Sequence, residues 1–112
     1  MKNKMPVSIS KITIIALTTL GQMIKSARIE RGISQLDLAS RLNVSRYTVM
    51  SIEKGDPKVS VGVSFEAAYI VGIPLLGDDL NQLNNLSLKW SNLASILPKR
   101  VGHPRQELDN DF

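Results

Sequence analysis

The chain has no cysteine and few aromatic residues. Among its 112 residues are two phenylalanines, two tyrosines and one tryptophan. Without thiols, neither a disulfide nor a thiolate metal site can form, which fits a reducing cytoplasm. A core with so few aromatic rings must be built from Leu, Ile, Val and Ala, which favours packed helices. The length predicts one small domain with additional segments at its ends.

Metal-binding, catalytic and membrane-spanning patterns are also missing from the sequence. The single histidine, His103, cannot form a metal site alone, and no Gly-rich loop follows a strand pattern. The apolar segment ITIIALTTL, residues 12–20, is far shorter than the roughly 20 residues that span a bilayer. It also lacks the small-residue cleavage motif of a signal peptide. We therefore expect no cofactor, no enzymatic activity, no membrane association and a cytoplasmic location.

Positive charge is concentrated in the middle of the sequence. The formal net charge is +4 at pH 7. Seven basic and four acidic residues lie between Thr18 and Ser60, whereas four basic and six acidic residues follow. A local excess of positive charge attracts polyanions such as DNA.

The N-terminal arm, residues 1–17, has a pattern of its own. Val7, Ile9 and Ile12 alternate with polar residues, which permits a short strand. An isolated strand needs a partner, such as the same strand of a second subunit. The alternative is a frayed arm.

Apolar residues at helical spacing predict a five-helix, all-α domain over residues 18–83. The helices are expected from about Thr18 to Gly32, after Ser34, after Ser45, from Val61 to Val71, and from near Pro74. The expected core consists of Leu20, Ile24, Leu36, Ala39, Leu42, Val44, Val49, Ile52 and Phe65. A short amphipathic helix over 84–98 and a disordered tail over 99–112 complete the predicted C-terminal extension.

The second and third of these helices are joined by a very short turn. Ser34 and Ser45 are suitable N-caps, and Asn43 tolerates the left-handed conformation that a sharp turn requires. Two short helices joined in this way form a helix-turn-helix unit. The outer face of the third helix carries Arg46, Tyr47, Met50, Ser51 and Lys54, and an α-helix with such a face fits the DNA major groove.

The segment IKSARIERGISQLDLASRLNVSRYTVMSIEKG, residues 24–55, resembles the lambda-repressor and Cro (XRE) type of helix-turn-helix. In that family an SQ pair opens the second helix, LA follows, VS opens the third helix and an IE.G pattern closes it. The resemblance extends from Leu20 to about Leu76. It implies a lambda-repressor-like fold and a repressor that binds double-stranded operator DNA.

The resemblance also implies roles for individual residues. Gln35 is expected to bond a phosphate and to brace the recognition helix, and Ser45 to cap that helix and to meet a phosphate. Arg46 and Tyr47 occupy the main base-reading positions, with Ser51 one turn further on. Arginine suits guanine, whereas tyrosine can stack on a sugar, touch a thymine methyl or bond a phosphate.

The resemblance also implies phosphate-binding or structural roles for five further residues. Thr48, Lys54 and Lys58 are expected to contact phosphates. Arg28 and Glu53 match a structural ion pair that bridges the first and third helices in this family.

A second resemblance concerns the kind of regulator. The phrases EKGDPKVSVGV, GDDLNQL and LPKRVG are similar to HipB-like antitoxins, which accompany HipA-like kinase toxins. This similarity implies a homodimer that represses its own operon and binds a kinase toxin. A stand-alone phage-type or housekeeping repressor is the alternative, and a helix-turn-helix used only for protein contacts is a third possibility.

The sequence leaves the dimer interface open. The apolar N-terminal arm is one candidate, and Ile73, Leu75 and Leu76 are another. A stripe of Trp90, Leu93 and Leu97 either packs in a core or dimer, or binds a partner protein.

Overall fold

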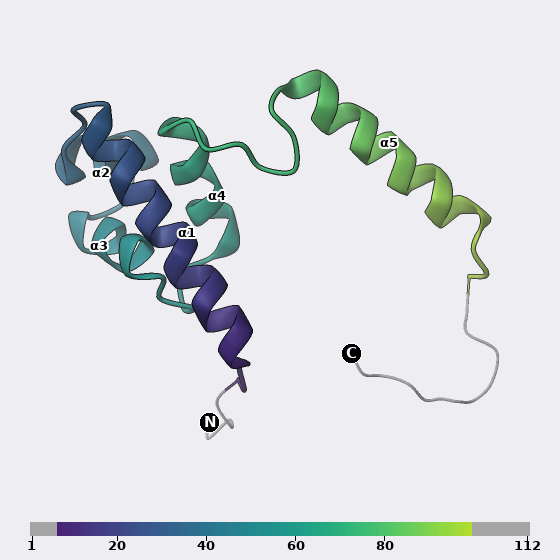
Figure 1. Cartoon of the computed structure of the whole chain (residues 1–112), viewed down its shortest axis with the longest axis horizontal. Coiled ribbons are helices and arrows are strands. Elements are labelled where there is room, and N and C mark those ends of the chain that lie inside the picture. The colour runs from purple at the N-terminus through teal and green to yellow at the C-terminus, as the bar shows by residue number, and fades with distance from the viewer. Residues whose placement is uncertain (1–6, 100–112) are drawn as a thin grey trace. The chain divides into compact units, whose positions relative to one another are not determined.

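The computed structural model describes residues 7–99, and this part of the chain contains five helices and no strand (Figure 1). They are α1 (Lys11–Glu30), α2 (Gln35–Leu42), α3 (Arg46–Lys54), α4 (Val61–Ile70) and α5 (Leu80–Ile96). The all-α, five-helix class is therefore confirmed. Contacts divide the chain after Leu75, so α1–α4 form one unit and α5 belongs to another. Over 7–99, no helix has the length and apolarity needed to cross a membrane.

Each helix begins at a polar cap whose side-chain oxygen accepts a hydrogen bond from the backbone amide three residues later. The five caps are Ser10, Ser34, Ser45, Ser60 and Asp79. Before α2 the cap is reciprocal, because the Asp37 carboxylate also accepts from the Ser34 amide at 3.4 Å. One such cap is typically worth about 1 kcal/mol. Local sequence thus fixes where the helices start.

The first four helices end in a common way, at a residue with positive φ. These residues are Gly32, Asn43, Gly55 and Gly72. In α1 the next amide, that of Ile33, donates to the Arg28 carbonyl at 3.0 Å, which satisfies a carbonyl left unpaired at the helix end. Ile33, Val44 and Ile73, which each follow such a residue, pack against the core.

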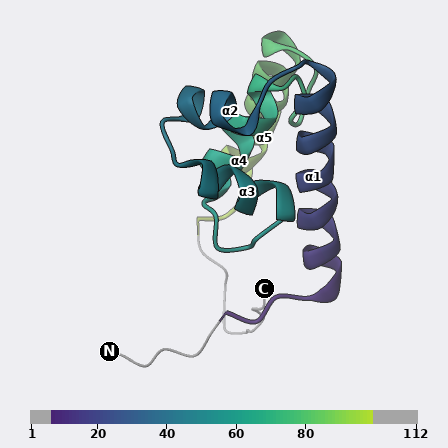
Figure 2. The same cartoon turned by 90° about the vertical axis from the view of Figure 1, so that its left-hand side faces the viewer.

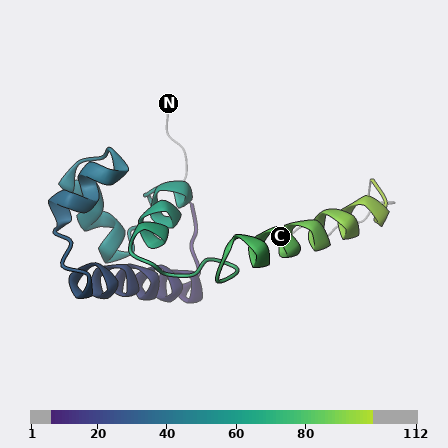
Figure 3. The ribbon, with the colours of Figure 1, turned by 90° about the horizontal axis from the view of Figure 1, so that it is seen from above.

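The core of the first unit is aliphatic. Its buried residues are Ile24, Leu38, Ala39, Val49, Ile52, Ala67, Ala68 and Val71. They come from α1, α2, α3, α4 and the residue after α4. Figures 2 and 3 show α1 lying along one side of the group formed by α2, α3 and α4. The long α1 therefore serves as the platform on which the short helices pack.

Two glycines bring the backbones of α1 and α3 into direct contact. A Cβ atom on Gly21 would lie 2.5 Å from the carbonyl oxygen of Glu53, and one on Gly55 would lie 2.6 Å from the Cα of Thr18. No side chain fits at either position without movement of the backbone. These close approaches hold the C-terminal end of α3 against α1.

Of the two possibilities for the N-terminal arm, the short strand is not present within the described residues. Ile12 lies in α1, and residues 7–10 have no regular structure. Helix α1 begins seven residues before the predicted Thr18, because the Ser10 hydroxyl accepts from the Thr13 amide at 3.3 Å and starts the helix there. Residues 1–6 of the predicted arm lie outside the described part.

Two predicted core residues are also wrong. Leu36 is 66% exposed and Phe65 is 39% exposed, whereas Leu38 is fully buried. Positions 36 and 38 lie about 200° apart on a helix, so only one of them can face the core with Ala39. In α4, apolar residues surround the helix axis, so periodicity does not select the buried face.

The C-terminal helices differ from the prediction as well. Residues 73–79 are not helical, so the helix expected near Pro74 is wrong, and α5 crosses the predicted boundary between residues 83 and 84. Leu76 has a φ of 62°, which helices exclude, and Asp79 caps the new start. Except for Lys99, the predicted tail lies outside the described residues.

We expect Gly21→Ala to lower the free energy of unfolding by about 2 kcal/mol, because the new methyl group overlaps the α3 backbone. The matched control is Gly62→Ala in α4, where a Cβ meets no atom within 4 Å. At that position alanine lowers the conformational entropy of the unfolded chain, which should raise the free energy of unfolding by about 0.5 kcal/mol. Urea denaturation followed by circular dichroism measures both, and equal effects would contradict the proposed close contact.

Candidate nucleic-acid interface

The turn between α2 and α3 gives the unit its helix-turn-helix geometry. Asn43 adopts the left-handed conformation predicted for it, with φ 56° and ψ 46°. The following amide, that of Val44, donates to the Ala39 carbonyl at 3.0 Å. The reversal of direction is thus completed by backbone hydrogen bonds, and Ser45 starts α3 only two residues after the turn.

Helix α3 divides cleanly into two faces. Val49, Ile52 and Glu53 are buried. Arg46, Tyr47 and Lys54 are exposed on the outer face, where Met50 and Ser51 are half-buried. These five outer residues span about 140° around the helix axis. The outer face is therefore available to a ligand without disturbing the core.

A buried ion pair joins α1 to α3. The Arg28 guanidinium makes two bonds to the Glu53 carboxylate, from Nε to Oε2 at 2.6 Å and from Nη2 to Oε1 at 3.2 Å. Their side chains are only 9% and 4% exposed. Arg28 also donates from Nη1 to the Ile33 carbonyl at 2.9 Å. The two predicted ion-pair partners are thus in contact, with bidentate geometry that fixes the guanidinium plane.

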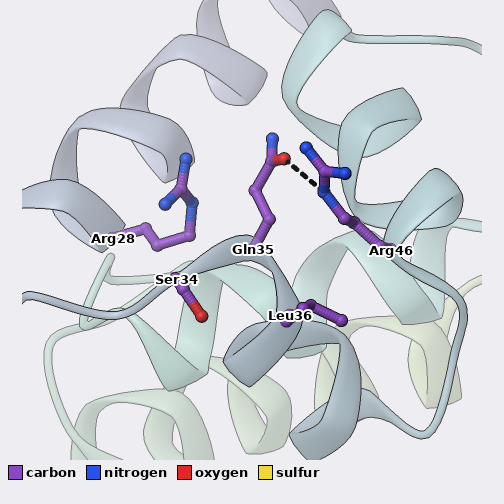
Figure 4. A pocket seen from close by; sticks show the side chains of 5 residues that line it. All are labelled: Arg28, Ser34, Gln35, Leu36 and Arg46. Carbon is purple, nitrogen blue, oxygen red and sulfur yellow. Dashed lines mark hydrogen bonds between the residues drawn. The ribbon is translucent and has the colours of Figure 1, made fainter.

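Gln35 extends this pair toward the outer face of α3. Its Nε2 donates to Glu53 Oε1 at 3.1 Å, and its Oε1 accepts from Arg46 Nε at 3.1 Å. Figure 4 shows the Gln35 amide and the Arg46 guanidinium facing each other. A continuous hydrogen-bonded chain therefore runs from Arg28 through Glu53 and Gln35 to Arg46. It joins α1, α2 and α3.

An open pocket of about 320 Å³ lies beside this chain (Figure 4). It is lined by Arg28, Ser34, Gln35, Leu36 and Arg46. Because Glu53 already pairs with Arg28, Arg46 supplies the positive charge that is not neutralised by a carboxylate in this pocket. The arrangement suits a single anionic group at the surface.

The remaining predicted site residues lie in different surroundings. The Ser45 hydroxyl accepts from the Thr48 amide at 3.1 Å, and the two hydroxyl oxygens are also 3.1 Å apart. Thr48 is half-buried and points away from the outer face. Lys54 is exposed at the end of α3, and Lys58 is exposed in the following loop, where its amide donates to Asp56 Oδ1 at 2.8 Å. Within residues 7–99, no hydrogen bond connects either lysine to the Gln35–Arg46 pair.

Sequence reasoning assigned no individual site role to two residues, although it placed Met50 on the outer face of the third helix. Asp37 completes the reciprocal cap before α2, and its signal is the spacing of a capping box, in which an acceptor side chain follows Ser34 by three residues. Met50 lies one turn after Arg46 on the outer face of α3, which the i, i+4 spacing already indicated. It is the only apolar side chain among the five outer residues.

Comparison with known proteins agrees with this geometry. A helix-turn-helix family model matches residues 24–75, which run from the middle of α1 to the residues after α4. An uncharacterized HTH-type transcriptional regulator of Methanocaldococcus jannaschii is 36% identical over 52 residues. That alignment covers 46% of this chain and 79% of the archaeal protein.

We expect Glu53→Gln to lower the free energy of unfolding by about 3 kcal/mol, because it leaves the Arg28 charge buried without a counter-ion. Exposed Glu66 on α4 is the matched control, and Glu66→Gln should change stability by less than about 0.5 kcal/mol. Adding Arg28→Met to Glu53→Gln should recover part of the loss. Urea titrations of these proteins and of Arg28→Met alone measure the coupling between the two side chains, and additive effects would argue against a buried pair.

Proposed function

Because the chain belongs to the helix-turn-helix family of DNA-binding transcriptional regulators, we propose that it is a repressor whose α3 reads an operator in the major groove. The observation that carries this proposal is the chain of hydrogen bonds that ends at Arg46. It positions a basic side chain on the outer face of a short helix. The proposed function is binding, with no catalytic step, in the cytoplasm.

Arg46 is the proposed guanine reader. Gln35 accepts from its Nε, so the terminal amino groups can bond to the O6 and N7 atoms of one guanine. This arrangement reduces the conformational freedom that Arg46 would otherwise lose on binding. Tyr47 and Ser51 are proposed to contact neighbouring nucleotides, and Met50 is suited to a thymine methyl group.

Phosphate contacts are proposed around this reader. The open pocket beside Gln35 and Arg46 can accept one phosphate at the start of α2. Ser45 at the start of α3 is placed for another. Exposed Lys54 and Lys58 add positive charge at the far end of α3. The Thr48 hydroxyl already lies against Ser45, so a phosphate contact there requires it to rotate.

A dimer is part of the proposal. One helix-turn-helix unit makes too few base contacts for tight and selective binding. Two copies related by a two-fold axis read two half-sites about 34 Å apart, one turn of DNA. The operator should accordingly be an inverted repeat.

We expect Arg46→Ala to weaken binding to the selected operator by about 1–3 kcal/mol and to relax the preference at one base pair. The operator is first selected from random duplexes with the wild-type protein. Lys11→Ala is the charge-matched control. Lys11 is the first residue of α1 and lies 17 residues before Arg28, at the opposite end of the helix from the ion pair. Gel-shift titrations at several salt concentrations should show an effect for Arg46→Ala that exceeds the loss of one general charge.

Adding Gln35→Ala sharpens the same experiment. If Gln35 acts by orienting Arg46, it should cost affinity in the wild type and much less in the Arg46→Ala background. Unchanged binding of specific and random DNA by Arg46→Ala would contradict the reading role. A protein with no salt-dependent DNA binding at all would favour the third possibility, a unit used only for protein contacts.

The antitoxin role is a second candidate, supported by the resemblance to HipB-like proteins. Two of the three sequence segments on which this resemblance rests also contain residues that end or cap a helix. EKGDPKVSVGV contains Gly55 at the end of α3, and GDDLNQL contains Asp79, which caps α5. The third phrase, LPKRVG, continues beyond the described residues. A stand-alone repressor therefore remains the alternative.

The two candidates differ in a partner protein. For an antitoxin, we expect the neighbouring reading frame to encode a HipA-like kinase and the two proteins to elute as one complex when produced together. The measurement is size-exclusion chromatography with mass determination. An unrelated kinase of similar size is the control for non-specific association. Separate elution of the two proteins, with operator binding intact, would favour the stand-alone repressor.

A further inference from the structure

Met50 lies in the middle of the outer face of α3. Arg46, Met50 and Lys54 follow one another at intervals of four residues and form a single ridge along the helix. Tyr47 and Ser51 form a second ridge, about 100° further around the helix axis than the first. The uncharged, flexible side chain of Met50 therefore stands between two cations on the surface that is proposed to face DNA.

The core of the protein does not account for this methionine. The buried side chains of α3 are Val49, Ile52 and Glu53, whereas Met50 is only half-buried. Met50 belongs neither to the buried core nor to the partly buried apolar residues that pack against it. A helix face that points away from the core is typically polar or charged. Met50 is an exception to this pattern, and folding of the described residues does not explain it.

The major groove of DNA offers one apolar group among its base edges. Guanine, cytosine and adenine present only hydrogen-bond donors and acceptors there, whereas thymine adds its C5-methyl group. A thioether donates no hydrogen bond and accepts only weakly. Placed over a polar base edge, it removes water without replacing the lost hydrogen bonds, which is unfavourable. Placed over thymine, it buries a methyl group against a polarizable sulfur atom.

We propose that Met50 is a specificity-determining residue that reads the methyl group of one thymine in each half-site. This inference rests on the proposed function and assigns a second base to the same reading face. Arg46, held by Gln35, gives the reference position, which is the guanine. Positions one turn apart on a helix are separated by about 6 Å along its axis. Because base pairs are stacked about 3.4 Å apart, the thymine lies within about two base pairs of that guanine.

The selectivity of this contact comes mainly from the three bases that it disfavours. Each of them would lose hydrogen bonds to water beneath the Met50 side chain, so the penalty adds to the gain at thymine. Tyr47 is a different kind of reader, because its 74% exposed ring ends in a hydroxyl group that can also bond to a phosphate. A methyl group contacted by Met50 is therefore distinguishable from one contacted by Tyr47.

The first test removes single methyl groups from the operator. Deoxyuridine replaces each thymidine in turn in the duplex selected with the full-length wild-type protein, and binding is measured by fluorescence anisotropy. At one position in each half-site, the substitution should weaken binding about fourfold, the factor expected for one buried methyl-sized group. Met50→Ala should weaken binding to the unmodified operator by a similar factor. The same deoxyuridine should then have no further effect on this variant.

The neighbouring ridge supplies the matched control. In Tyr47→Ala, the loss caused by deoxyuridine at that position should persist, because a different residue reads the methyl group. The opposite pattern, with the loss abolished by Tyr47→Ala and kept by Met50→Ala, would overturn the proposal. Met50→Ala should unfold at the same urea concentration as the wild type, because Met50 does not pack against the core.

A second test exchanges the recognised base. Glutamine is similar in length to methionine, and its amide can bond to both N6 and N7 of adenine. Selection from random duplexes with Met50→Gln should therefore shift the preference at that position from thymine to adenine and leave the guanine position unchanged. Met50→Leu, which keeps an apolar side chain, should retain thymine. A thymine preference that survives in Met50→Gln would reject the assigned role.

The outcomes also separate this proposal from the proposed function. A wild-type protein that selects no sequence from random duplexes would reject both. Selective binding that depends on Arg46, but in which every thymidine can be replaced by deoxyuridine without loss, would reject only the role of Met50. The proposed reading of guanine by α3 would then still stand.

Discussion

The buried contact between Arg28 and Glu53 is the interaction on which the arrangement of α1, α2 and α3 depends. Two charges removed from water are stable only with close partners, and here the carboxylate receives three hydrogen bonds. One of them comes from Gln35 on a different helix. The position of α2 relative to α3 is therefore tied to a pair that also holds α1. Burying charges is usually unfavourable, but in this fold the buried pair fixes the positions of three helices relative to one another.

The surrounding packing explains why such a register is needed. Helices of eight or nine residues, such as α2 and α3, are too short to be stable alone. Their core is aliphatic, and much of it consists of alanine, which offers little shape to define a rotation. The close approach at Gly21 sets the distance between α1 and α3, and the ion pair sets their relative alignment. Packing and polar contacts thus supply different constraints.

Local features were predictable from the sequence, and the choice of faces was not. Ser34, Asn43 and Ser45 act within four residues of themselves, so capping and turn chemistry identified them correctly. Leu36 and Leu38 look alike in sequence, and only the position of α1 and α4 decides which is buried. Similarly, Arg28, Gln35, Glu53 and Arg46 were each selected through the family resemblance. Their connection into one series of hydrogen bonds depends on side-chain conformations that cannot be predicted from the spacing of the residues in the sequence.

The outer face of α3 has a consequence for how this protein can change. Tyr47, Met50 and Lys54 make no side-chain hydrogen bond within the described residues and contribute little to the core. These residues can therefore change at almost no cost in folding stability, and under the proposed function the recognised DNA sequence would change with them. Arg46 is different, because its partner Gln35 is bonded to the ion pair. The proposed recognition by this helix thus has one position that is tied to the fold and several that are free to diversify.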